Sequence, residues 1–141
     1  MKHLLFICTL LLCIACKEDK SVDPTIMPQA TTSGQNTFGC VIDGWLYASG
    51  RWGIPTASYI IEGENDTEIT INAEVNFSSY IHFIIINPKQ GETTSYTDAS
   101  FDTQSLEDGN VYITRMSDGI ISGTFKGTRM LEGRFDLKYS E

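Results

Sequence analysis

The chain has 141 residues, with 18 acidic and 10 basic side chains and a formal charge of −8 at pH 7. This acidity argues against nucleic-acid binding and against electrostatic adhesion to anionic lipid, since both need a basic surface. Residues 37–141 are long enough to bury one hydrophobic core, so we expect a single domain there.

The N-terminus has the layout of a bacterial lipoprotein signal. Met1-Lys2-His3 precedes an apolar run from Leu4 to Ala15, and Cys16 follows directly. This run is shorter than the roughly 20 residues that a membrane-spanning helix needs, but it suits a signal peptide. We predict that residues 1–15 are removed and that Cys16 is lipidated, with palmitate among its acyl chains. An ordinary secretory signal, which would leave Cys16 as a free thiol, is the alternative.

The residues after Cys16 indicate a location. Lys17, Glu18 and Asp19 resemble the export tag of Bacteroidetes-type surface lipoproteins, a basic residue followed by two acidic ones. The resemblance implies anchoring in the outer membrane with exposure at the cell surface; the alternative is a charged, solvated linker without a targeting role. Few apolar residues follow, so residues 16–36 are predicted to be a lipidated, flexible tether.

Only one cysteine is left for the domain. Cys8 and Cys13 would be lost with the signal and Cys16 would carry lipid, so Cys40 has no disulfide partner within the chain. The loss of Lys2 also changes the formal charge from −8 to −9. The domain must therefore be stabilised by its core alone.

Residues 37–141 show short alternating segments separated by turn residues, the pattern of β-strands. Asp43-Gly44 predicts a tight hairpin turn. Tyr80–Ile86 is apolar on both faces and is predicted to be a central strand covered on both sides. A short helix is considered within residues 98–106. The expected strands are residues 37–42, 45–48, 57–62, 68–75, 80–86, 93–97, 111–116, 120–127 and 133–139.

These elements predict an all-β fold, a single antiparallel β-sandwich or partly closed barrel of about 8–9 strands. Short connections favour a meander. Gly123 and Gly127 share the inward face of their strand with Phe125, and we expect them to leave room for aromatic rings.

Three segments carry a resemblance to known proteins. Small Bacteroidetes-type lipoproteins of unknown function are similar to this chain in its opening Asn36–Trp45 (NTFGCVIDGW) and in its closing Ile121–Gly127 and Glu132–Tyr139, which contain SGTFKG and GRFDLKY. The resemblance implies the fold and the location but no activity.

Few residues suggest catalysis. His82, the one histidine after the signal, lies on an apolar strand, and Cys40 lies beside Phe38 and Ile42, so both are interpreted as structural. One histidine and one cysteine do not make a zinc site. The carboxylates Glu62, Glu64, Asp66 and Glu68 around one turn are interpreted as a solvated hairpin tip, with calcium as the alternative. We expect neither metal nor other cofactor, and no enzymatic activity.

Exposed aromatic residues are the better indication of binding. Trp45, Trp52 and Tyr59 are the candidate ligand-binding residues, because aromatic rings suit sugar stacking and protein interfaces. The sequence therefore favours a non-catalytic module that binds a protein or a glycan, as part of an outer-membrane assembly or alone. The alternatives are an acidic inhibitor or scavenger of a cationic protein, and a carrier of a small apolar ligand.

Overall fold

A computed structural model describes residues 26–49, 54–62, 66–76 and 78–140. The predicted signal peptide, Cys16, the export residues Lys17, Glu18 and Asp19, and Trp52 lie outside the described residues. Within the described ranges, no helix is long and apolar enough to cross a bilayer.

Ten strands make up the described fold, and all of them belong to one sheet. They are β1 Thr37–Ile42, β2 Trp45–Ala48, β3 Thr56–Glu62, β4 Asp66–Val75, β5 Ser79–Ile86, β6 Thr93–Phe101, β7 Gln104–Ser105, β8 Gly109–Ser117, β9 Ile120–Gly127 and β10 Met130–Ser140.

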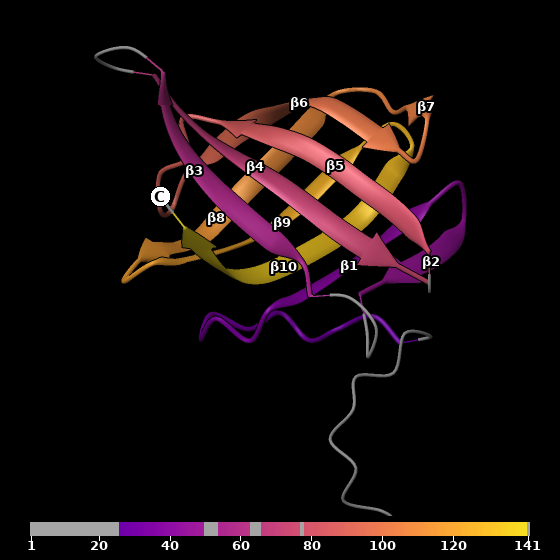
Figure 1. Cartoon of the computed structure of the whole chain (residues 1–141), viewed down its shortest axis with the longest axis horizontal. Helices are drawn as coiled ribbons and strands as arrows, with labels where there is room; N and C mark the ends of the chain where they lie inside the picture. The colour runs from indigo at the N-terminus through magenta and orange to yellow at the C-terminus, as the bar shows by residue number, and fades with distance from the viewer. Residues whose placement is uncertain (1–25, 50–53, 63–65, 77, 141) are drawn as a thin grey trace, which may run out of the picture.

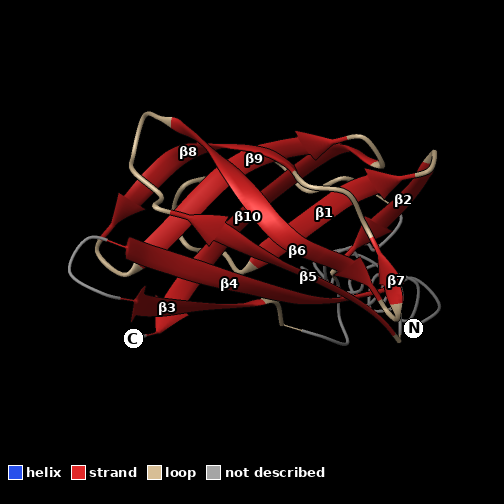
Figure 2. Cartoon of the chain, turned by 90° about the horizontal axis from the view of Figure 1, so that it is seen from above, coloured by secondary structure: helices blue, strands red, loops and turns tan. Residues whose placement is uncertain are grey.

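Seven of these strands close into a barrel, and three are additions to it (Figures 1 and 2). The ring runs β3-β4-β5-β6-β8-β9-β10, so each strand lies beside the next one along the chain apart from the small β7. The predicted all-β class and meander are confirmed. Of the two predicted architectures, the structure shows a barrel rather than a sandwich, because the sheet curls round to meet itself.

The closing contact of the barrel is parallel, because the number of strands in the ring is odd. Strands in a meander alternate in direction, so the first and seventh run the same way and can only pair in parallel. That pairing joins Tyr139 to Ala57 and Ser140 to Ser58 and extends no further. Most of the same edge of β10 is occupied by β1, which pairs with it from Thr37↔Asp136 to Ile42↔Met130.

The β1–β2 hairpin forms as the sequence predicts. Asp43 and Gly44 have φ values of 49° and 87°, the left-handed pair that a tight two-residue turn requires. Asn76 binds the β2 strand of this hairpin through two hydrogen bonds. Its side-chain amide donates to the Leu46 carbonyl at 3.1 Å, and its Oδ1 accepts from the Ala48 N–H at 3.3 Å. This short ribbon extends the sheet beyond the seven-stranded ring.

Aromatic rings fill the middle of the barrel. The Phe83 ring centroid lies 5.0 Å from that of Phe125 and 5.1 Å from that of Tyr96, and Phe38 stacks on Phe125 at 5.6 Å. Phe135 also stacks on Phe125, with a centroid distance of 6.0 Å. All five rings are buried, so the domain has the packed core that it needs in place of a disulfide.

Glycines make this aromatic packing possible. Phe125 lies directly across from Gly133 on β10, and Phe135 lies directly across from Gly123 on β9. A Cβ at Gly133 would overlap the Phe125 ring, and a Cβ at Gly123 would come 3.0 Å from the Phe135 ring. The two strands therefore exchange aromatic–glycine pairs, and the room predicted at Gly123 is confirmed.

Tyr96 uses two further glycines in the same way. It pairs with Gly109, which in turn pairs with Gly127, and a Cβ at either glycine would collide with the Tyr96 hydroxyl. This confirms the expectation for Gly127. The hydroxyl has no hydrogen-bond partner among the described residues, and burial raises the pKa of Tyr96 to about 12, with the charges of Cys40 and Asp108 adding to the effect.

Two predictions about single elements are wrong. The strand β5 is buried on one face only, through Ile81, Phe83 and Ile85, while Tyr80 is exposed. In a barrel, one face of each strand points into the core and the other points outward. The outward residues of β5 therefore stay at the surface, even though two of them are isoleucines. The helix considered within residues 98–106 is also absent: β6 continues to Phe101, turns at Asp102 (φ 50°), and returns as β7.

The described end of the predicted tether lies along the barrel. We call residues 27–36 the strap. The buried carboxylate of Asp136 accepts hydrogen bonds from the Thr31 hydroxyl at 2.7 Å and from the N–H groups of Gly34 and Gln35 at 2.8 and 3.0 Å. The Ser122 hydroxyl of β9 donates a fourth bond at 2.6 Å. Asp136 thus joins the strap to two barrel strands.

Other strap contacts extend along β10 and β8. The Arg134 guanidinium donates to the Pro28 carbonyl at 3.2 Å, and that of Arg115 donates to the Thr32 carbonyl at 2.6 Å. Asn36 Oδ1 accepts from the Lys138 N–H at 3.1 Å. The polar groups of the strap therefore have specific partners on the barrel, and the flexibility of residues 16–36 stays a prediction.

Candidate functional site

The structure does not bring the predicted ligand-binding aromatics together. Trp45 is 73% exposed on β2, near the hairpin turn. Tyr59 on β3 is half-buried and packs against Tyr139, with ring centroids 5.8 Å apart. β2 and the C-terminal end of β3 lie at opposite ends of the barrel (Figure 1). Trp45 is accessible as expected, whereas Tyr59 serves mainly to support the core.

Cys40 lies in the core as the sequence indicated, whereas the side chain of His82 is partly exposed. Cys40 is fully buried, and burial raises the pKa of its thiol to about 12, which disfavours the reactive thiolate. His82 lies on the outer face of β5, where its Nδ1 is 2.8 Å from Asn72 Oδ1 and its Nε2 is 3.6 Å from Asp98 Oδ2. Both ring nitrogens therefore face polar neighbours on adjacent strands.

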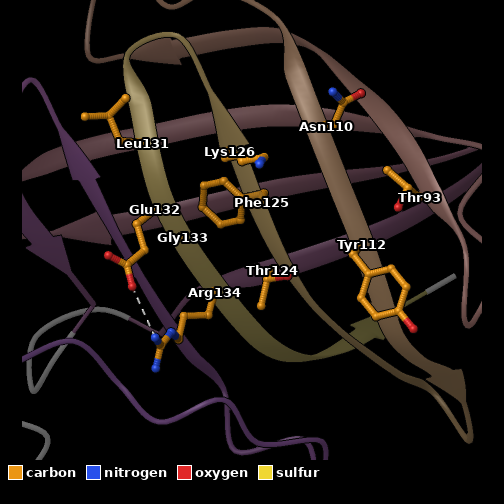
Figure 3. A pocket seen from close by; sticks show the side chains of 10 residues that line it. All are labelled: Thr93, Asn110, Tyr112, Thr124, Phe125, Lys126, Leu131, Glu132, Gly133 and Arg134. Atoms are coloured by element: carbon orange, nitrogen blue, oxygen red, sulfur yellow. Dashed lines mark hydrogen bonds and ion pairs between the residues drawn. The ribbon is translucent and has the colours of Figure 1, made fainter.

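A hollow of about 390 Å³ lies on the outer face of the barrel, and neither Trp45 nor Tyr59 lines it. Figure 3 shows the side chains around it, which come from β6, β8, β9 and β10. Its size falls within the range typical of small-ligand sites, about 300–1,000 Å³. The residues that line it are Thr93, Asn110, Tyr112, Thr124, Phe125, Lys126, Leu131, Glu132, Gly133 and Arg134.

The hollow forms where β10 leaves β9. Their pairing ends at Gly133↔Phe125, and beyond it β10 pairs with β1 alone. Val41 pairs with Glu132 and Ile42 with Met130, so Leu131 is an extra residue in a β-bulge. A bulge bends the strand that carries it. The two strands therefore separate beyond the Phe125–Gly133 pair.

Cross-strand pairing brings polar side chains to this surface in a row. Tyr112 pairs with Thr93 on one side and with Thr124 on the other, and Thr124 pairs with Arg134. In a second row, Asn110 pairs with Lys126. Directly paired side chains on one face are about 5 Å apart, so a ligand in the hollow can reach several donors and acceptors at once.

Arg134 is held in a fixed position at the edge of the hollow. One guanidinium nitrogen donates to the strap carbonyl of Pro28, and another lies 3.3 Å from Glu132 Oε1. A side chain held from two sides loses less conformational entropy when it binds a ligand. The strap therefore supports the hollow, although no strap residue lines it.

Sequence reasoning did not find the hollow, because its lining residues belong to four strands whose pairing was unknown. One signal was present: Tyr112 is a large aromatic residue at an outward position of an alternating strand, and it is 45% exposed.

Comparisons of the chain with known protein families, with curated proteins and with solved structures find no match. The resemblance to small Bacteroidetes-type lipoproteins, carried by the opening and closing segments, stays a prediction. The function must therefore be argued from the geometry of the hollow.

Proposed function

We propose that this protein is a lipid-anchored, surface-displayed module that binds a glycan in the hollow without acting on it chemically. Anchoring through Cys16 and display through Lys17, Glu18 and Asp19 are the sequence-based part of the proposal. The observation that carries the binding part is the hollow itself, where an exposed tyrosine is surrounded by hydrogen-bonding side chains.

The chemistry of the lining suits a sugar. The apolar C–H face of a pyranose ring packs well on an aromatic ring, and Tyr112 offers one at the surface. Sugar hydroxyls donate and accept hydrogen bonds, and Asn110, Thr93 and Thr124 can do both. Leu131 adds apolar contact on the opposite side (Figure 3). A purely apolar ligand would leave most of these groups without partners.

The lining also supports binding rather than hydrolysis. Glycoside hydrolysis usually requires two carboxyl groups on either side of the bond that is cleaved. Among the ten residues that line the hollow, Glu132 is the one carboxylate, and it is paired with Arg134. Such a pair can hold a substrate hydroxyl but does not supply both an acid and a base.

The other functions considered from the sequence fit less well. A carrier of a small apolar ligand needs an open interior, and the middle of this barrel is filled by five aromatic rings. An inhibitor of a cationic protein is compatible with the net charge, but the hollow carries Lys126 and Arg134 against a single carboxylate. We therefore propose neither for this site.

The binding test is a glycan array probed with the wild-type protein and two matched variants. Tyr112→Ala removes the stacking ring from the hollow, and Tyr80→Ala removes a tyrosine of similar exposure, 56%, from β5 outside it. We expect selective binding that falls about tenfold or more in Tyr112→Ala, since stacking is worth about 1–3 kcal/mol, and no change in Tyr80→Ala. Equal loss in both variants, or no bound glycan, would contradict the proposal.

The anchoring test uses metabolic labelling with an alkyne-tagged palmitate. The wild-type chain should take up label and be removed by protease from intact cells, and Cys16→Ser should not be labelled. Label retained in Cys16→Ser would show that the lipid is attached elsewhere. These results are independent of the glycan array, so either half of the proposal can fail alone.

A further inference from the structure

The seam at which the barrel closes leaves part of one strand without a partner. β3 extends to Glu62, but its pairing with β10 ends at Ser58↔Ser140. Beyond Ser58, within the described residues, β3 pairs only with β4. We call the stretch Tyr59–Glu62 the open edge. Figure 1 shows β3 and β4 continuing past the end of β10.

The register shows which backbone groups of the open edge are free to bind. Ile61 pairs with Thr67. Thr67 directs its backbone away from β3: its N–H donates to Asn87 Oδ1, and its carbonyl accepts from the Asn87 N–H, both at 2.8 Å. In an antiparallel pair of strands, two directly opposite residues either bond to each other or both point away from each other. Since Thr67 points its N–H and C=O away from β3, its partner Ile61 points its own N–H and C=O away from β4. The backbone groups of Ile61 therefore point outward from the sheet edge.

The side chains of the open edge are those of an interface. Ile61 is 66% exposed, and Ile60 is also exposed on the opposite face of the strand. Unpaired backbone together with exposed β-branched residues is the arrangement that edge strands normally avoid, because it invites pairing with another chain. Here it lacks the usual protection, since neither residue is a lysine or a proline.

Charge selects the kind of partner. Glu68 pairs with Ile60, and Asp66 pairs with Glu62, so carboxylates border the open edge on β4. A second copy of the chain would bring the same carboxylates together and would add its own charge of −8 to that of the first. Four residues of edge are also short for a stable dimer, which commonly buries about 800 Å² per partner.

We propose that the open edge binds an extended segment of a partner protein in which basic and apolar residues alternate. The segment adds a strand beside β3 and pairs with the outward N–H and C=O of Ile61. Its apolar side chains pack against Ile61 on one face of the sheet, and its basic side chains lie on the other face, near Asp66 and Glu68. This surface is separate from the hollow, so one protein can hold a glycan and a protein partner at once.

The test uses two synthetic octapeptides, one of alternating lysine and valine and one of alternating glutamate and valine. Amide hydrogen exchange of the wild-type protein is followed by NMR with each peptide. We expect the Ile61 amide to exchange rapidly in the free protein and to slow at least tenfold with the lysine peptide, but not with the glutamate peptide. A protected Ile61 amide in the free protein, or equal effects of the two peptides, would overturn the proposal.

Two proline variants check the register on which the proposal rests. Ile61→Pro removes an outward N–H, so it should abolish binding of the lysine peptide while the melting temperature stays close to that of the wild type. Ile60→Pro removes an N–H directed at β4, so it should lower the melting temperature markedly. Peptide binding retained by a folded Ile61→Pro would contradict the pairing, and wild-type stability of Ile60→Pro would contradict the register.

Discussion

Replacing Asp136 tests how the strap is joined to the barrel. Asp136 is 1% exposed and accepts four hydrogen bonds, from Thr31, Gly34, Gln35 and Ser122. A hydrogen bond to a charged group contributes about 1.5–3 kcal/mol, but removing the carboxylate also removes the cost of burying it. We expect Asp136→Ala to lower the free energy of unfolding by about 3–5 kcal/mol, measured by urea denaturation at pH 7.

Ser122→Ala is the matched control for this prediction. It removes one of the four bonds and leaves the carboxylate with the three from the strap. Its cost should be about 1–2 kcal/mol. If Asp136→Ala cost less than Ser122→Ala, the carboxylate would not be the group that holds the strap.

The pH dependence follows from the same contacts. Burial alone would raise the pKa of Asp136, but the bonds from Gln35, Ser122, Thr31 and Gly34 outweigh it and lower that pKa overall. A lowered pKa in the folded state stabilises the protein at pH values above the ordinary Asp value of about 3.9. This contribution is lost as the pH falls from there towards the lowered pKa.

Asp136→Asn provides the comparison, because it cannot titrate. The stability difference between wild type and Asp136→Asn should be constant from pH 7 to about pH 5 and should shrink as the pH falls through about 4. Both proteins carry the same other carboxylates, so their contributions cancel in the difference. A difference that stays constant down to pH 2.5 would refute the reasoning.

Two further predictions concern the core. Gly133→Ala places a Cβ in the Phe125 ring, so it should lower the stability measured by thermal unfolding by about 1–3 kcal/mol. Phe125→Leu in the same chain should recover part of this loss. Additive losses would show that the two residues do not compete for space. Cys40 is buried, and its pKa is raised to about 12. At pH 8, iodoacetamide should therefore modify Cys40 only under conditions that unfold the protein, as measured by peptide mass mapping. Rapid modification of the folded protein would contradict the structure.

Local features of the fold could be predicted from the sequence because neighbouring residues determine them. Asp43-Gly44 indicates its turn through the φ values that only such residues accept readily. The alternation of Phe135, Leu137 and Tyr139 indicates the inward face of β10. The glycines at 123 and 127 indicated space for aromatic rings before the partners, Phe135 and Tyr96, were known.

Closure of the barrel could not be predicted, because it depends on pairing between residues far apart in the chain. β3 and β10 meet through only two residue pairs, and no local pattern marks Ala57 or Ser140 as partners. The apolar outer face of β5 was misleading for the same reason, since alternation does not distinguish a covered strand from a barrel wall that is exposed on one side.

The hollow and the strap depend on similar long-range contacts. The hollow exists because Leu131 is a bulge residue relative to β1, which the sequence does not show. The strap is low in apolar residues, so its composition indicated a flexible tether, but its hydrogen bonds to Asp136 come from a strand about 100 residues later. Exposed Trp45 indicated a binding surface by composition alone, without the neighbours that would make a site.

The most direct test of the account is an NMR titration of the domain with the glycan that binds best on the array. We predict chemical-shift changes concentrated on the outward residues of β8, β9 and β10, namely Asn110, Tyr112, Thr124, Lys126 and Arg134, with core amides such as those of Phe38 and Ile71 unchanged. Changes centred on the core, or on a surface away from the hollow, would contradict the claim that this barrel binds its ligand on the outside.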